Sequence, residues 1–336
     1  MKHDIMKVWH SMIYNCFYKL KPYLENEMIT DINYNGKDLW LDHLREGRLL
    51  ISNFMTECEA YKMCLKFSNA VNKNLNLQNP VLEADLNFFR VSIIHPSITG
   101  SIAISIRKST DKLRLNEETM LAKEYISKSA LNFLKYCVQS RVNLMISGLP
   151  GSGKTELLKF LTQYIHENER VITIEDSYEL HYQSLHPNRD CVAIKVNRFF
   201  PYEKAIVASL RQRADWILLS EVRGQEIIDL LNSASTGTHL MSTIHAQSAR
   251  EIPLRMRTMI PSEREDLRSQ IEQLIHVGVH IDLYMNELGI HRRVREIVVF
   301  NDKDSEYVYH YSNKRDARKI PDIIKEKGKI YGAGYW

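Results

Sequence analysis

Cysteine is scarce in this chain, and its few copies follow no disulfide or metal-binding pattern. The 336 residues include five cysteines, an odd number, and no two of them form a Cys-x-x-Cys pair. Disulfide frameworks need paired cysteines and zinc ribbons use Cys-x-x-Cys hooks, so neither is predicted. The sequence favours reduced, packed thiols.

Long apolar runs and a strong charge of one sign are also missing. No run approaches the roughly 18 apolar residues of a membrane-spanning helix, and the opening MKHDIMKVWH lacks the uninterrupted apolar core of a signal peptide. The 45 Lys and Arg residues nearly balance 41 Asp and Glu residues, and the formal net charge is +4. This bias is too weak to argue nucleic-acid binding, and we expect a cytoplasmic protein with no direct nucleic-acid binding.

The chain is long for one compact core, and its patterning predicts two domains. Residues 25–108 carry short β-prone runs broken by turns, which predict an α+β domain with an antiparallel sheet. Polar residues predict a linker at 109–119. Residues 120–301 alternate strand-like and helix-like runs, as a parallel sheet with crossover helices would. Three later runs predict an antiparallel edge on this sheet: 277–285, 292–300 and 306–311.

Each end of the chain carries a segment with two open interpretations. Residues 1–24 predict an amphipathic helix whose apolar face packs against its own domain or a neighbouring subunit, or else contacts a membrane surface or partner. Its apolar positions recur at helical spacing: Ile5, Val8, Trp9, Met12, Ile13, Cys16, Phe17 and Leu20. Residues 302–336 read as a basic extension that is either solvated or a docking site for acidic partners or lipid.

A phosphate-loop motif stands between the first strand and first helix of the second domain. The segment GLPGSGKT matches GxxxxGK(S/T), which favours phosphate binding over a plain glycine turn with a surface lysine. Backbone N–H groups would cradle the β-phosphate, Lys154 would bridge the β- and γ-phosphates, and Thr155 would bind Mg²⁺. The predicted nucleotide-binding residues here are Gly148, Pro150, Gly151, Ser152, Gly153, Lys154, Thr155 and Glu156.

Carboxylates at the ends of two apolar runs are the candidates for positioning water. Glu175 and Asp176 end the run 171–176, and Glu221 ends the run 216–221. Strand ends of a parallel sheet meet at one edge, so these groups are expected beside the phosphate loop. The alternative for the first two is a solvated strand-end charge, and for Glu221 a carboxylate at a helix N-terminus.

Two histidines flank a third run that is unusually polar for a buried strand. His239 precedes LMSTI and His245 follows it. Their placement favours a γ-phosphate or coupling role, while satisfied core histidines and metal ligands are the alternatives.

Four motifs in this order carry a family resemblance. GLPGSGKTELL, ITIEDSYEL, LRQRADWILLSEVRG and STGTHLMSTIHAQS resemble the secretion and pilus ATPase superfamily, and the likeness spans roughly residues 25–300. It implies an α/β protein: an N-terminal α+β (PAS-like) domain followed by a RecA-like P-loop NTPase domain with a mainly parallel sheet. The absence of a tetracysteine insertion favours the type IV secretion and tight-adherence pilus branch over the type II export branch.

The resemblance also implies roles for single residues. Glu175 would help order Mg²⁺ or water, Glu221 would be the Walker B glutamate that polarises water, and His245 would belong to the family's histidine box. Arg90 and Arg107 would match N-domain arginines that reach the phosphates on domain closure. Arg211 and Arg213 would be further family-typical basic positions.

The chain departs from the family pattern at four positions. The family's Walker B strand ends in Gly-Glu, so Ser220 replaces a glycine and no aspartate is lost. Glu156 stands where a second threonine is usual, and Ala214 replaces a proline. His239 is shifted by one position within the histidine box.

The function that the resemblance implies is an ATP-hydrolysing motor with ATP and Mg²⁺ as cofactors. It would act as a ring of six identical subunits, peripherally associated with the cytoplasmic face of the membrane. Its partners would be inner-membrane components of a secretion, conjugative transfer or pilus assembly apparatus. Two alternatives stay open: an ATP-dependent nucleic-acid translocase and a nucleotide-gated assembly scaffold with negligible turnover. Cargo and direction of work are left open.

Overall fold

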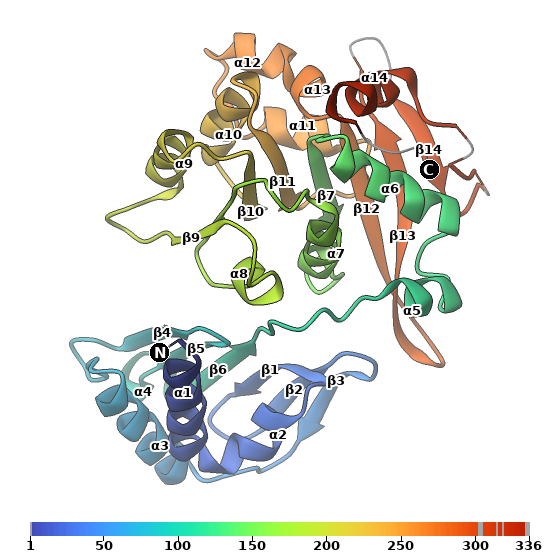
Figure 1. Ribbon diagram of the computed structural model, residues 1–336. Helices are drawn as coiled ribbons and strands as arrows, with labels where there is room; N and C mark the ends of the chain where they lie inside the picture. Colours follow the sequence, from blue (N-terminus) through green and yellow to red (C-terminus); the bar gives the residue numbers. More distant parts are fainter. Residues whose placement is uncertain (1, 302–304, 314, 318, 333–336) are drawn as a thin grey trace. The chain divides into compact units, whose positions relative to one another are not determined.

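The computed structural model describes residues 2–301, 305–313, 315–317 and 319–332, and the side chains from residue 9 onward within these ranges (Figure 1). The chain divides into two compact units. Unit 1 comprises the residues up to Thr110 together with Met285–His291, and unit 2 comprises Asp111–Tyr284 and the residues from Arg292 onward. Each unit has its own buried core and is described by itself.

Unit 1 is an antiparallel sheet of six strands packed with helices. Its strand order is β3-β2-β1-β6-β5-β4. The strands are β1 Ile29–Tyr34, β2 Leu39–His43, β3 Gly47–Ile51, β4 Val81–Leu86, β5 Phe89–Ile94 and β6 Ala103–Lys108. The helices are α1 Lys2–Cys16, α2 Lys21–Glu25, α3 Glu57–Ala70 and α4 Pro96–Thr99, with a 3₁₀ turn at Tyr18–Leu20.

Local sequence explains two of these elements. Thr56 accepts the backbone N–H of Glu59 while the Glu59 carboxylate accepts that of Thr56, and this capping box starts α3. Along β5, Phe89, Val91 and Ile93 are buried because side chains alternate between the two faces of a strand.

The N-terminal helix packs against its own domain. Ile13, Cys16, Phe17 and Leu20 are buried in the unit 1 core, and the rings of Phe17 and Phe67 on α3 lie 5.0 Å apart. The described part of the apolar face is therefore covered by the domain itself. The side chains of Ile5 and Val8 lie outside the described residues.

Unit 2 is an eight-stranded sheet with helices on both faces. Its strand order is β14-β13-β12-β7-β11-β10-β8-β9. The strands are β7 Leu144–Gly148, β8 Val171–Glu175, β9 Cys191–Lys195, β10 Trp216–Val222, β11 His239–Ile244, β12 Val277–Asn286, β13 Gly289–Val299 and β14 Glu306–His310. Strands β7, β8 and β11 are buried along their whole length, as expected for a sheet covered on both sides.

The helices of unit 2 contribute to two separate cores. One core holds buried residues of α6 Lys128–Gln139, α7 Lys154–Leu161 and α14 Asp322–Tyr331, with α5 Glu117–Ala122 beside them. The other holds residues of α9 Tyr202–Arg211, α10 Glu226–Ser235, α11 Ile252–Arg257, α12 Glu265–Ser269 and α13 Ile271–Leu274. Two short elements complete the unit, α8 Tyr182–Leu185 and the 3₁₀ turn Thr162–Tyr164.

Two sequence expectations about the end of the chain need correction. Strand β12 runs parallel to β7, so it extends the parallel core, because α11–α13 carry the chain back across the sheet before it starts. Only the β13–β14 pair has the antiparallel pairing expected there. The described residues after Asn301 are no solvated extension, because Ala317, Ile320 and Ile324 are buried in the first core.

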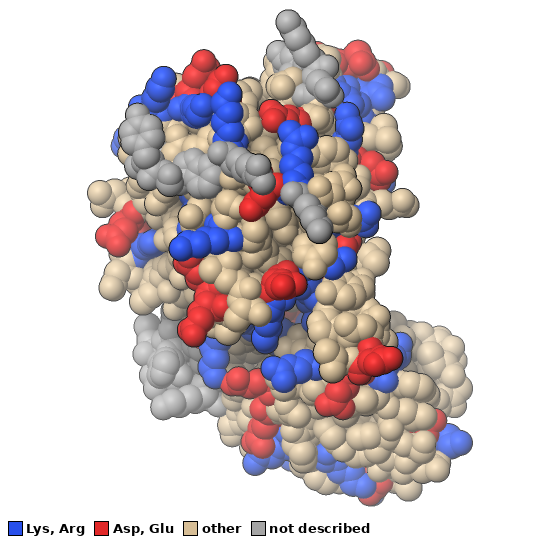
Figure 2. Space-filling model, turned by 90° about the vertical axis from the view of Figure 1, so that its right-hand side faces the viewer, with Lys and Arg blue, Asp and Glu red and all other residues tan. Residues whose placement is uncertain are grey.

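The described surface shows no element of membrane type and no single-sign face in view. No described helix combines the length and apolarity needed to cross a bilayer. On the face drawn in Figure 2, basic and acidic side chains are interspersed.

Candidate active site

Strand register brings the predicted motifs to one edge of the unit 2 sheet. Ile244 of β11 pairs with Ser147 of β7, so the residues that follow, His245 and Gly148, lie side by side. Because β8, β10, β11 and β7 are all parallel neighbours, the acidic box and the Walker B strand end at the same edge.

The phosphate loop has the conformation that its glycines predict. Gly148, Gly151 and Gly153 have φ values of 151°, 75° and 90°, a region that glycine adopts at little cost. A Cβ on Gly148 would lie 2.6 Å from Ser152 Oγ and 2.7 Å from the Ile281 carbonyl oxygen, so no side chain fits. The loop leads directly into α7 at Lys154, whose first backbone N–H groups lack intrahelical partners and suit an anion.

Lys154 is held inside this loop. Its side chain is buried, and Nζ donates to the carbonyl oxygens of Gly148 at 2.9 Å and Leu149 at 3.3 Å. Burial lowers the pKa of Lys154, while Glu221 and Glu179 oppose that shift. The amine therefore points at the atoms that enclose the loop, where phosphate oxygens can accept the same hydrogens.

A chain of short contacts links Lys154 to the Walker B glutamate. His245 Nδ1 lies 3.3 Å from Lys154 Nζ, and His245 Nε2 lies 2.5 Å from Glu221 Oε1. Arg223 donates to Glu221 Oε2 at 2.7 and 3.0 Å and to Asp176 Oδ2 at 3.2 Å. The structure thus brings Lys154, His245 and Glu221 together as predicted for one site.

The other histidine lies elsewhere. His239 begins β11 and pairs with Trp216, the first residue of β10, so it lies at the amino edge of the sheet. Its ring packs near those of Trp216 and Tyr331, and burial lowers its pKa to about 4. The structure places His239 as a core residue, which was one of the alternatives for this strand.

Glu175 and Glu179 of the acidic box have different tasks. Glu175 is buried, and its Oε2 accepts the backbone N–H groups of Glu179 and Leu180, each at 2.8 Å. Glu175 thereby shapes the turn after β8. Thr155 Oγ1 donates to Glu179 Oε2 at 3.4 Å, so Glu179 is the carboxylate beside the predicted Mg²⁺ ligand. The sequence reasoning missed Glu179, although it stands in the same ITIEDSYEL motif.

Glu175 gives the fold a pH dependence with a definite sign. Burial raises its pKa from 4.5 to about 7, and the two backbone hydrogen bonds only partly oppose this. Between these values the folded chain keeps a proton that the unfolded chain has lost, so stability falls as pH rises through this window. The expected loss is on the order of 3 kcal/mol.

The measurement is the free energy of unfolding at about pH 5 and about pH 8, for wild type and Glu175→Gln. Glutamine keeps an acceptor oxygen for the two N–H groups but does not ionise. We expect the wild type to lose stability relative to the variant at the higher pH. Parallel pH profiles for the two proteins would show that Glu175 is not a buried, protonated group.

The remaining loop residues have local partners. Glu156 Oε1 lies 3.4 Å from Nζ of the buried Lys159, so the glutamate in place of threonine is paired along α7. Ser220 is also buried and is hydrogen-bonded to the Tyr202 phenol, so the strand accommodates serine where the family has glycine. Arg292 of β13, another residue that the sequence reasoning missed, donates through Nε to the Gly151 carbonyl oxygen at 2.8 Å.

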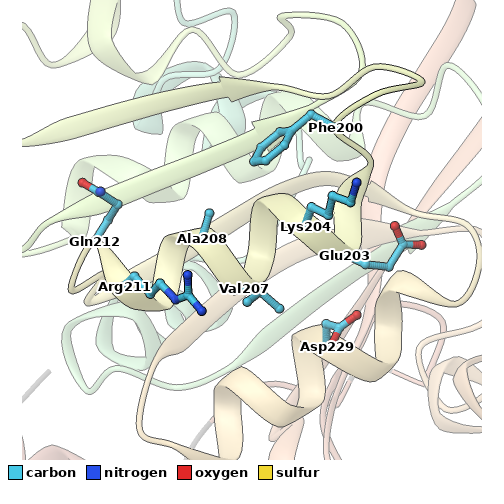
Figure 3. Close-up of a pocket in the computed structure, with 8 residues that line it drawn as sticks. All are labelled: Phe200, Glu203, Lys204, Val207, Ala208, Arg211, Gln212 and Asp229. Atoms are coloured by element: carbon cyan, nitrogen blue, oxygen red, sulfur yellow. The ribbon is translucent and has the colours of Figure 1, made fainter.

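The predicted basic residues are distributed over both units. Arg90 and Arg107 are paired in register on β5 and β6 of unit 1, and Arg107 Nε donates to Asp31 at 2.8 Å. Arg211 ends α9 just before β10, at the amino edge of the sheet. Figure 3 shows it lining a groove away from the phosphate loop, formed by Phe200, Glu203, Lys204, Val207, Ala208, Arg211, Gln212 and Asp229. Arg213 follows in the connection to β10.

Comparisons with known proteins agree with this geometry. An uncharacterized protein of Bacillus anthracis is 30% identical over 260 residues, which are 75% of this chain and 58% of that protein. The chain therefore spans little more than half the length of that relative. A putative conjugal transfer protein of Mycobacterium tuberculosis is 25% identical over 335 residues, covering 92% of this chain and 93% of that protein.

A solved structure and a family model complete the comparison. The X-ray structure of the Yersinia pseudotuberculosis ATPase DotB matches with a TM-score of 0.68 at 17% identity, over 95% of this chain and 86% of that one. This likeness confirms the predicted fold class. The family model described as "Type II/IV secretion system protein" matches residues 71–282, more than half of the chain. The chain belongs to the type II/IV secretion system protein family.

Proposed function

We propose that this chain is an ATP-hydrolysing motor subunit for a secretion, conjugative transfer or pilus apparatus. One observation carries the proposal: a phosphate-loop lysine, a histidine and a buried-strand glutamate form a continuous series of contacts at the carboxyl edge of the sheet. A cation for phosphate and a carboxylate for water are the two groups that ATP hydrolysis needs side by side.

The loop fits the phosphates of a nucleotide. Its glycine conformations leave the backbone open to a close approach, and Lys154 Nζ already uses hydrogen bonds that phosphate oxygens would accept. The start of α7 adds backbone N–H groups and the positive end of the helix dipole. These residues would hold the triphosphate of ATP.

The residues beside the loop also fit Mg²⁺. The Thr155 hydroxyl and the Glu179 carboxylate are hard oxygen donors in mutual contact. Across the described ranges no group of three or more His, Cys, Asp or Glu residues could hold a metal, as suits an ion that keeps most of its waters. Mg²⁺ bound there would neutralise charge on the phosphates. We assign Thr155 and Glu179 to it, with Glu175 supporting the turn that carries Glu179.

Glu221 is the group that would orient and deprotonate the attacking water. It follows the buried residues of β10, and its side chain is 15% exposed, which restricts the water that can reach it. His245 contacts both Glu221 and Lys154, so it can relay a change at the phosphate to the carboxylate.

The motor cycle would involve both units and neighbouring subunits. Arg90 and Arg107 are directly opposed cations on the unit 1 sheet, which makes them candidates to reach the phosphates on domain closure. Arg107 would first exchange its contact with Asp31. Six identical subunits in a ring, working on inner-membrane components of the apparatus from the cytoplasmic face, is the assembly we propose from family membership.

Single-stranded DNA tests this proposal against a nucleic-acid translocase. We expect phosphate release from Mg-ATP by the full chain to change by less than about twofold when single-stranded DNA is added at low salt, where backbone contacts are strongest. The interspersed charges in Figure 2 support this expectation. Stimulation by several-fold that disappears as salt is raised would instead identify a translocase.

A further inference from the structure

Arg223 is the most heavily engaged charged side chain next to the candidate active site. It follows β10 directly, and its guanidinium binds Glu221 through two N–H groups and Asp176 through a third. These contacts use one oxygen of Glu221, while His245 contacts the other. Both oxygens of the glutamate that would handle water are therefore occupied by cations or hydrogen-bond donors.

The Asp176 side of this arrangement is itself held in place. The Tyr202 phenol, on the first residue of α9, is hydrogen-bonded to the backbone N–H of Asp176 and to the Ser220 side chain. Tyr202 thus joins the end of β8 to the end of β10. The serine that replaces the family's glycine supplies one of these contacts and keeps Asp176 and Glu221 at a fixed spacing under Arg223.

Arg223 is close enough to the phosphate loop to respond to an anion there. Its charge contributes to lowering the pKa of Lys154, which places the guanidinium within electrostatic reach of the amine. The side chain is 60% exposed, so it has room to reorient. An arginine guanidinium binds phosphate oxygens in a bidentate way and more strongly than neutral acceptors.

We propose that Arg223 is a positioning residue that discriminates ATP from ADP. Without a γ-phosphate, Arg223 remains on Glu221 and Asp176 and keeps Glu221 from water. When a γ-phosphate occupies the loop, the guanidinium exchanges Glu221 for a terminal phosphate oxygen, and Glu221 Oε2 becomes available to water. The inference rests on the proposed function, because it deepens the role of the same nucleotide site.

The test compares Arg223→Gln with wild type by calorimetric titration of Mg-ADP and of Mg-ATPγS, a slowly hydrolysed ATP analogue. We expect the variant to bind ADP within about twofold of wild type and to lose about tenfold in ATPγS affinity, one charge-assisted contact less its exchanged partner. Arg211→Gln, the same change in the groove on α9, is the control and should leave both affinities unchanged.

Each outcome decides between positioning and plain support of the fold. An equal loss for both nucleotides, or no loss for either, would overturn the inference while leaving the proposed function intact. Arg223→Lys keeps the charge without the bidentate fork, so intermediate discrimination with an unchanged melting temperature supports the proposal if glutamine destabilises the chain. A wild-type chain that binds neither nucleotide would remove the proposed function together with this inference.

Discussion

Glu221→Gln is expected to keep ATP affinity near that of wild type and to lower kcat by roughly 10² to 10⁴. Glutamine has the same size and can still contact His245 and Arg223, so the loop around Lys154 should keep its shape. It has no negative charge with which to accept a proton from water. The loss should therefore fall on kcat, because the removed interaction matters in the transition state and not in nucleotide binding.

Steady-state kinetics together with equilibrium ATP binding measure this effect. Glu203→Gln makes the same charge change on the exposed face of α9 and serves as the matched control. It should hydrolyse ATP at the wild-type rate. A Glu221→Gln protein with wild-type kcat would remove Glu221 from the mechanism.

Lys154→Met should weaken ATP binding on the order of 100-fold, because two charge-assisted contacts to phosphate disappear. Methionine keeps the buried aliphatic volume that Lys154 fills between the loop and His245. Burial already disfavours the Lys154 charge, so the free chain should remain folded after the change.

Equilibrium titration with Mg-ATP and thermal unfolding of the free protein check both parts of this prediction. Lys204→Met, on the exposed side of α9, is the control for the loss of one positive charge. Unchanged ATP affinity in Lys154→Met would show that the loop does not hold the phosphates as proposed.

The parts of the site that the sequence predicted are those set by consecutive residues and strand ends. The phosphate loop follows from eight adjacent residues, and the position of Glu221 follows from an apolar run that ends in a carboxylate. The carboxyl edge of a parallel sheet then brings these segments together, whatever the crossover helices contain.

The parts that escaped prediction depend on neighbours distant in the chain. Glu175 and Glu179 stand four positions apart in one motif, and only the fold shows that the first binds backbone while the second reaches Thr155. Arg292 meets Gly151 across 141 positions. Spacing along the chain carries no signal for contacts of this kind.

The end of the chain shows how composition can mislead. A high content of Lys and Arg after Asn301 indicated a solvated tail, yet a few apolar residues at helical spacing decide the outcome. Ile320 and Ile324 are buried, and Gly328 lets α14 approach Tyr136 of α6, where a Cβ would come within van der Waals contact of the ring. Burial of a few apolar side chains outweighs the many charges that stay in solvent.

The most direct test of the whole account is multiple-turnover phosphate release from Mg-ATP by the purified full chain. The account predicts linear release that continues far beyond one phosphate per subunit and stops when Mg²⁺ is chelated. Release that ends at or below one phosphate per subunit would contradict it and would identify a nucleotide-gated scaffold instead of a motor.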